Sequence, residues 1–181
     1  MAKPLKLHLG CFRKKLPGFV NVDIRSDVEP DVVDDAFTLK KFKNGTADLI
    51  YICHTLEHAD RDGAMKAMIR YHEVLKPGGI LRVSVPDMQA VMENYIYFRD
   101  LRAIKSYFHG GQTHDWDYHR SGWDWRTMKE DLEEVGFVKV YKWDWRKTDH
   151  WYCDDYSQAY HPHMDKINGK QMSLNVEAVK A

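Results

Sequence analysis

The sequence predicts one α/β domain over residues 1–181, a three-layer sandwich in which helices cover both faces of a mostly parallel seven-stranded sheet whose last strand is antiparallel. Segments with the alternation of strands are followed by segments with the periodicity of helices, which is the order found in α/β folds. Residues 47–53 (ADLIYIC) are almost continuously apolar, as in parallel strands that are buried on both faces. A chain of 181 residues fits one domain, since domains run from about 100 to 200 residues.

The strands are marked by alternation and by the turn residues that bound them. Residues 5–9 alternate apolar and polar side chains up to Gly10, and residues 19–24 alternate after a Pro-Gly pair. A weak third strand is expected after a proline, at 31–35. The remaining strands are expected at 47–53, 80–85, 137–143 and 172–179.

The helices follow from apolar spacing and end signals. Between residues 60 and 75, apolar side chains recur every three or four positions, which predicts an amphipathic helix. Asp87 is placed to cap a second helix running to about residue 104, and 127–135 forms a third that a glycine closes. Only residues 10–18 join the first two strands, whereas a parallel crossover with its helix needs about a dozen residues. We therefore predict that the first crossover helix is short or missing.

Composition excludes several classes of protein. The chain is 44% hydrophobic and 30% charged, as expected for a packed fold, and its 27 basic and 27 acidic residues cancel. A neutral surface disfavours bulk binding to nucleic acid or to an anionic membrane. The chain has no signal-peptide pattern at its start and no apolar run long enough to span a bilayer, and its three cysteines are an odd number without paired spacing. We expect a cytoplasmic protein with free thiols.

Glycine and acidic residues stand where consecutive strands end. Gly10 ends the first strand, Asp23 the second, and a pair of acids the third. In open parallel sheets, ligands bind beyond the carboxyl ends of the strands, and a carboxylate there can accept both hydroxyls of a ribose. Asp23 fits that role.

Five segments together resemble class I S-adenosylmethionine-dependent methyltransferases, in particular the small type-11-like group. The segments are residues 7–12 (LHLGCF), 21–24 (NVDI), 34–36 (DDA), 54–58 (HTLEH) and 75–81 (LKPGGIL). The resemblance implies a Rossmann-like methyltransferase fold, S-adenosylmethionine as the cofactor, S-adenosylhomocysteine as the product, and methyl transfer as the reaction.

The resemblance also implies a set of cofactor-binding residues. Gly10, Cys11 and Phe12 would lie against the methionine moiety, Asp23 and Ile24 beside the ribose, Asp35 and Ala36 beside the adenine, and His54 with Leu56 near the cofactor. Phe12 stands where the family usually has the second glycine of its loop, so its side chain competes for space with the ligand.

Residues 54–58 also match H-x-x-E-H, a zinc-protease pattern in which two histidines four positions apart on a helix bind the metal. His54 directly follows a buried strand, and the periodic helix begins only near Asp60, so the pentapeptide does not lie in one helix. We expect a loop beside the cofactor and no metal ligand. A metal-dependent hydrolase using His54 and His58 remains an alternative, which predicts stoichiometric zinc.

Residues 109–122 are rich in glycine and histidine and too long for a simple connection. They resemble the substrate-binding insertions of the same group, so we expect a lid over 105–125 that covers a small-molecule acceptor, with a sugar or glycan precursor as the preferred class. His119 is the first candidate for the general base and His114 the second. The six tryptophans, all between 116 and 151, are expected to fill the core below the last strands.

Other interpretations stay open. A non-catalytic binding module that lost cofactor affinity through Phe12 has the same fold. A nicotinamide-dependent dehydrogenase is disfavoured because G-x-G-x-x-G is absent. A cysteine nucleophile has no visible base partner, although a position near a helix amino terminus would lower the pKa of Cys11. Residues 161–163 (HPH) are expected to form an ordinary exposed loop.

Overall fold

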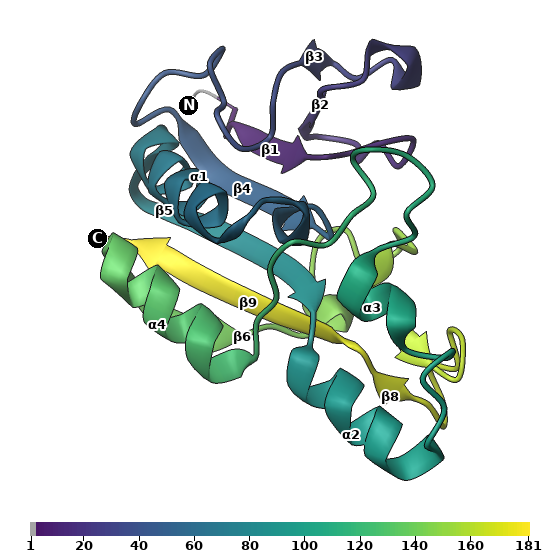
Figure 1. The fold of residues 1–181 in the computed structure, drawn as a ribbon. Coiled ribbons are helices and arrows are strands. Elements are labelled where there is room, and N and C mark those ends of the chain that lie inside the picture. Colours follow the sequence, from purple (N-terminus) through teal and green to yellow (C-terminus); the bar gives the residue numbers. More distant parts are fainter. Residues whose placement is uncertain (1–2) are drawn as a thin grey trace.

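The computed structural model describes residues 3–181, so Met1 and Ala2 of the predicted domain lie outside it. Its main sheet has seven strands in the order β3-β2-β1-β4-β5-β9-β6, and only β9 runs antiparallel to its neighbours (Figure 1). The strands are β1 Lys6–Leu9, β2 Val20–Asp23, β3 Val32–Val33, β4 Ala47–Cys53, β5 Leu75–Pro86, β6 Phe137–Lys142 and β9 Ser173–Lys180. The predicted mostly parallel sheet is confirmed, as is the missing first crossover helix, because residues 10–19 form only turns and coil.

Two helices, α1 Arg61–Val74 and α4 Trp125–Val135, cover one face of the sheet (Figure 1). The Asp60 side chain caps α1 by accepting from the Gly63 amide at 2.7 Å, and Gly136 ends α4 in the left-handed conformation. Side chains from every second position of β4, such as Ile50 and Ile52, pack against these helices in the largest hydrophobic core.

The predicted helix at 87–104 is shorter than expected. The Asp87 side chain caps α2 Met88–Phe98 as predicted, but Arg99 then turns left-handed at φ 55° and ends the helix. A separate short helix, α3 Lys105–His109, follows. The sequence has no glycine where α2 ends, so its helical pattern continues past that point and predicts a helix that is too long.

Residues 143–159 cover the opposite face with irregular chain and two 3₁₀ turns, η3 Trp145–Lys147 and η4 Tyr156–Gln158, where helices were expected. This face of the sheet carries polar side chains that need hydrogen-bond partners when they are buried. A helix that packs on the sheet through an apolar stripe does not provide such partners. The Tyr51 hydroxyl donates to Asp155 at 2.7 Å, and the Arg82 guanidinium donates to Asp149 at 3.3 Å. Residues 143–159 therefore cover this face of the sheet in place of a helix. Their polar groups are the hydrogen-bond partners of the polar side chains on the strands.

The tryptophans divide between core and surface. Trp123 and Trp143 are buried as predicted, but Trp116 and Trp151 are 62% and 59% exposed, so the prediction is wrong for these two. Two further strands, β7 Tyr160–His161 and β8 Lys170–Gln171, form a separate small sheet that was not predicted, because two residues show no periodicity. Within residues 3–181, none of the helices has the length and apolar character needed to cross a bilayer.

Candidate active site

A cavity of about 490 Å³ lies beyond the carboxyl ends of β1 and β4. Four of the predicted cofactor residues line it: Gly10, Cys11, Phe12 and His54. Its other lining residues are His8, Lys14, Cys53, His58, His114, Asp117, Asp154, Asp155, Tyr156, His163 and Met164. The volume lies within the range of sites for small organic ligands.

Gly10 is required by its conformation and by a close neighbour. Its φ is +64°, and a Cβ built at this position would lie 2.2 Å from Oγ1 of Thr55 and 3.0 Å from its Cβ. The end of β1 therefore packs directly on the turn that follows β4, which leaves no room for a side chain between them.

Asp23 is buried at the end of β2, where two backbone amides hold its carboxylate. The amide of Phe12 donates to Oδ2 at 2.8 Å and the amide of Arg25 to Oδ1 at 2.9 Å. Each oxygen keeps a lone pair for a further donor. Asp23 does not line the cavity itself, but it is hydrogen-bonded to the backbone of Phe12, which does.

Phe12 adopts a backbone conformation that favours glycine, with φ at +43°. Its ring is 47% exposed at the rim of the cavity, with the guanidinium groups of Arg13 and Arg25 at 5.6 and 5.3 Å from its centroid. The ring does not fill the hollow, but it borders the path between the cavity and Asp23.

Replacing Phe12 by glycine is expected to tighten binding of S-adenosylmethionine about 3- to 10-fold in calorimetry, or up to about 1.4 kcal/mol. The substitution removes the ring from the rim, where it competes with the ligand for space. It also relieves the left-handed backbone, which costs a non-glycine residue about 1 kcal/mol, and this should raise the stability of the protein with or without the cofactor. Phe12→Ala is the control, because it removes the ring but keeps the strain, so it should bind the cofactor like the glycine variant without the gain in stability. Weaker binding by the glycine variant would contradict the assignment of this rim.

The remaining predicted cofactor residues are placed differently. Leu56 and Ala36 are buried in the main hydrophobic core, so their side chains face away from the cavity and only their backbone is available to a ligand. Ile24 is exposed beyond Asp23, and Asp35 accepts from the amide of Phe37 at 2.8 Å. None of these four lines the cavity.

A second cavity, of about 380 Å³, adjoins the first and shares six of its lining residues: His54, His58, Asp117, Tyr156, His163 and Met164. Its own lining adds Glu57, Ser106, Tyr107, Gly110, Gly111, His119, Ala159 and Tyr160. The predicted lid thus provides one wall of this cavity, and the segment between β6 and β9 provides the other.

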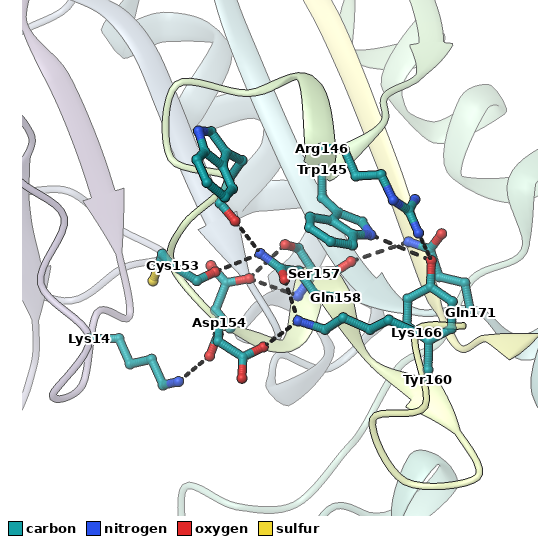
Figure 2. Close-up of polar contacts among 12 residues, drawn as sticks. Lys14, Trp145, Arg146, Cys153, Asp154, Ser157, Gln158, Tyr160, Lys166 and Gln171 are labelled. Atoms are coloured by element: carbon teal, nitrogen blue, oxygen red, sulfur yellow. Dashed lines mark hydrogen bonds and ion pairs between the residues drawn. The ribbon is translucent and has the colours of Figure 1, made fainter. Parts of the chain in front are cut away.

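The wall formed by residues 153–166, which contributes Tyr156, His163 and Met164 to both cavities, is held together by polar contacts that Figure 2 shows. The Lys166 ammonium donates to Asp154 at 2.8 Å and to Gln158 at 2.6 Å, and the Gln158 amide donates to the Cys153 carbonyl at 2.8 Å. Lys14, in the loop after β1, donates to the carbonyl of Asp154. These contacts tie the wall to the loop that carries Gly10.

The pentapeptide 54–58 does not lie in one helix, as predicted. His54 follows β4 with φ at +46°, and a 3₁₀ turn, η2 Leu56–His58, comes next. The Nε2 of His54 lies 2.8 Å from the Ser173 hydroxyl, which itself donates to the Tyr156 carbonyl, so this nitrogen is the donor. The zinc-protease arrangement of His54 and His58 is therefore absent.

Glu57 is a fully buried carboxyl group between histidines. Neither of its oxygens has a hydrogen-bond partner among residues 3–181, and the nearest nitrogens to Oε1 are Nδ1 of His54 at 3.3 Å and Nε2 of His119 at 3.9 Å. Burial raises the pKa of Glu57 to about 8 and lowers the pKa of His54 to about 3. The cluster is therefore neutral near pH 7.

The two histidines beside Glu57 are oriented by backbone carbonyls. His119 lies with Nδ1 2.9 Å from the Tyr107 carbonyl, and His58 with Nδ1 3.2 Å from the Tyr118 carbonyl. Because a carbonyl only accepts, each Nδ1 is the donor, which leaves Nε2 of both neutral rings with a free lone pair. The ring centroids are 4.9 Å apart, edge to face. Burial lowers the pKa of both imidazoles, so both lone pairs are available at neutral pH.

The loop that carries His119 is fastened to the turn that carries Glu57. The amides of Arg120 and Ser121 donate to the Glu57 carbonyl at 2.8 and 3.2 Å, and the Ser121 hydroxyl donates to the Ala59 carbonyl. His114, the second predicted base, lies on the exposed part of the loop and lines only the first cavity.

Several site residues were missed or misjudged from the sequence. Glu57 was noted only as part of the H-x-x-E-H pattern, the wall at 154–156 had no local signal, and His163, placed in an ordinary loop, lines both cavities. A lowered pKa was considered for Cys11, but the pKa of its thiol is raised to about 11. Burial is the main cause, and the nearby charge of Asp23 adds to it.

A third cavity, of about 660 Å³, lies between α1, α4 and the loop segment 119–123. It shares Tyr107 and His119 with the second cavity, but none of its lining residues comes from the loop that carries Gly10. Although it is larger, it is separated from the carboxyl ends of β1 and β4, and we assign no ligand to it.

Comparison with known proteins identifies the fold. The sequence model of a type-11 family described as a methyltransferase domain matches residues 16–83. No curated protein matches the chain. Among solved structures, a SAM-dependent methyltransferase from Archaeoglobus fulgidus is 16% identical with a TM-score of 0.60, covering 98% of this chain and 86% of that one.

Two other solved structures are similar. A SAM-dependent methyltransferase from Thermotoga maritima, described as a possible histamine N-methyltransferase, is 13% identical with a TM-score of 0.62, covering 100% and 84% of the two chains. One from Methanosarcina mazei is 15% identical with a TM-score of 0.61, covering 99% and 94%. At these identities the likeness shows the fold.

Proposed function

We propose that the chain is a class I S-adenosylmethionine-dependent methyltransferase of the type-11 group, whose family model matches residues 16–83, and that it methylates a hydroxyl or amine of a small polar acceptor, with a sugar or glycan precursor as the preferred class. The observation that carries this proposal is the pair of adjoining cavities, one at Gly10 and one at His119, that share His54 and His58. Two reactants placed in adjoining cavities are held for direct transfer between them.

The residues at the first cavity fit the cofactor. The loop from Gly10 to Phe12 lines it, and the buried Asp23 carboxylate is fixed in place with a lone pair free on each oxygen. Asp23 would bind the ribose hydroxyls with Ile24 beside it, and Asp35 and Ala36 would border the adenine. S-adenosylmethionine, when bound, supplies the electrophilic methyl group of a sulfonium.

His119 is proposed to activate the acceptor. Its Nε2 carries a free lone pair and faces the second cavity, while the Tyr107 carbonyl fixes its tautomer. An acceptor oxygen or nitrogen in that cavity gives its proton to a base as its bond to the methyl carbon forms and the carbon–sulfur bond breaks. His114 is the second candidate for this role.

The lid proposed at residues 105–125 closes the second cavity. Tyr107, Tyr156 and Tyr160 provide aromatic walls, and Ser106 and Asp117 provide polar groups. Aromatic faces combined with hydroxyl and carboxylate groups suit the apolar faces and hydroxyls of a sugar ring. The neutral net charge supports a small-molecule acceptor over nucleic acid or membrane, and the three free thiols support a cytoplasmic location.

The proposal is tested by calorimetry with S-adenosylmethionine, followed by assay of S-adenosylhomocysteine release with a panel of monosaccharides, nucleotide sugars and small amines. We expect cofactor binding, and turnover with a member of the sugar classes. Asp23→Asn should weaken the cofactor by about 1 to 3 kcal/mol, whereas Asp27→Asn, an exposed neighbour, should not. Absence of cofactor binding would support the non-catalytic binding module instead.

A further inference from the structure

Glu57, His58 and His119 each present one ligand atom, and these atoms lie within 4.8 Å of one another. We propose that the three side chains bind a divalent cation of the zinc type at the inner end of the second cavity. The binding itself stands on the geometry alone, and only the role of the cation in catalysis rests on the function proposed above.

The buried carboxyl group of Glu57 points to a ligand. The side chain is fully buried, and both of its oxygens lack a hydrogen-bond partner among the described residues. A buried polar group without a partner costs free energy, and such groups in native proteins are normally satisfied or coordinate a metal. The side chain also lines the second cavity, so a cation entering through that cavity can reach it.

The two imidazoles have the orientation of metal ligands. Histidine ligands almost always donate their second ring N–H to a carbonyl or carboxylate, which fixes the ring and directs the other lone pair at the metal. His119 donates from Nδ1 to the Tyr107 carbonyl and His58 from Nδ1 to the Tyr118 carbonyl. Both outer contacts are therefore present, and the free Nε2 of His119 faces Oε1 of Glu57 at 3.9 Å.

The type of ligand selects the type of cation. Two imidazoles and one carboxylate form the ligand set of catalytic zinc sites, in which the fourth position stays open. At zinc–ligand bonds of about 2.0 to 2.2 Å, tetrahedral ligands stand roughly 3.4 Å apart, so the three side chains would move inward by about 1 Å or less. All three residues line the second cavity or its junction with the first, so the open position would face the acceptor.

The site differs from the one that the H-x-x-E-H pattern suggests and from our expectation of no metal ligand. His54 is engaged through Nε2 with Ser173 and lies 3.3 Å from Glu57 through Nδ1, which places it beside the ligand set and outside it. The second histidine of the proposed ligand set is instead His119, which lies on a loop much later in the chain. Backbone amides of this loop are hydrogen-bonded to the Glu57 carbonyl.

A cation at this position changes how His119 acts in the proposed reaction. Such a cation would lower the pKa of an acceptor hydroxyl bound to it, so that the proton could pass to water while the oxygen bonds to the methyl carbon and the carbon–sulfur bond breaks. His119 then serves as a ligand, and its effect on the acceptor passes through the cation.

Titration of Zn²⁺, and separately of Mg²⁺, into the chelator-treated full chain tests the site. We expect one Zn²⁺ per chain with much weaker Mg²⁺ binding, and visible absorption from tetrahedral Co²⁺ in its place. Glu57→Gln and His119→Ala should each weaken Zn²⁺ about 100-fold or more, while His163→Ala, which lines the same cavity, should bind like the unaltered protein. If Glu57→Gln does not fold, His58→Ala serves in its place.

Two outcomes overturn the proposal: no stoichiometric Zn²⁺ in the unaltered chain, or Zn²⁺ binding that both ligand variants retain. Failure of the site and failure of the function are distinguishable. A chelator-treated protein that transfers methyl groups at the full rate overturns the catalytic role of the cation and leaves the function in place. A protein that binds Zn²⁺ through these residues but releases no S-adenosylhomocysteine with any acceptor leaves the site in place and contradicts the function.

Discussion

His119→Ala is expected to reduce methyl transfer about 10²- to 10⁴-fold while leaving affinity for S-adenosylmethionine nearly unchanged. The side chain lines the second cavity and not the first, so its loss removes activation of the acceptor without touching the loop at Gly10. Steady-state release of S-adenosylhomocysteine measures the first effect, and calorimetry with the cofactor measures the second.

A second variant separates chemistry from loop anchoring. His119→Asn offers an amide donor to the Tyr107 carbonyl but no basic nitrogen, so it should be as slow as His119→Ala if the lone pair matters. His109→Ala, at the exposed end of α3, is the matched control and should keep most of the activity. Equal losses of turnover and cofactor affinity in His119→Ala would instead identify a structural histidine.

Gly10→Ala is expected to destabilise the fold by about 3 to 4 kcal/mol, which corresponds to a fall of about 10 °C in Tm for a chain of this size. Part of the loss comes from placing alanine at φ +64°, and the larger part from contact with Thr55, whose own Cβ would lie only 3.0 Å away and cannot rotate aside. Because the same loop lines the first cavity, cofactor binding should fall as well.

The chain contains a matched control for this effect. Gly18 also has a positive φ, at +83°, but a Cβ there would meet nothing within 4 Å, so Gly18→Ala should cost only about 1 kcal/mol. Removing the neighbour in Gly10→Ala/Thr55→Gly should restore part of the lost stability, as expected for two residues in contact. Equal melting temperatures for Gly10→Ala and Gly18→Ala would show that the contact with Thr55 does not matter.

Much of the architecture could be predicted because its signals are local. Alternation and a nearly continuous apolar run marked the strands, apolar spacing marked α1, and the capping residue Asp87 marked where α2 begins. The covering segment at 143–159 could not be predicted, because it has no periodicity and is held by contacts such as Tyr51 to Asp155, which join residues 104 positions apart. Long-range polar contacts of this kind leave no pattern in a short window of sequence.

Some residues of the site could likewise be predicted from local signals, whereas others could not. Gly10 and Asp23 stand at strand ends, where the topology alone brings them to one edge of the sheet. The burial of the Leu56 side chain in the main core could not be predicted, because the orientation of a 3₁₀ turn does not follow from residue type. The H-x-x-E-H pattern includes Glu57, but its burial could not be predicted because it depends on a loop that returns to the turn much later in the chain.

The position of β9 has a consequence for how the protein is made. This strand pairs with β5 on one side and β6 on the other, yet both of those strands precede it in the chain. During synthesis on the ribosome, the inner edge of β5 therefore emerges long before its neighbour exists, with backbone donors and acceptors open to other nascent chains. Residues 173–180 complete the sheet by pairing with β5 and by providing the strand on which β6 pairs, so the newborn protein most needs protection from aggregation until they have been synthesised.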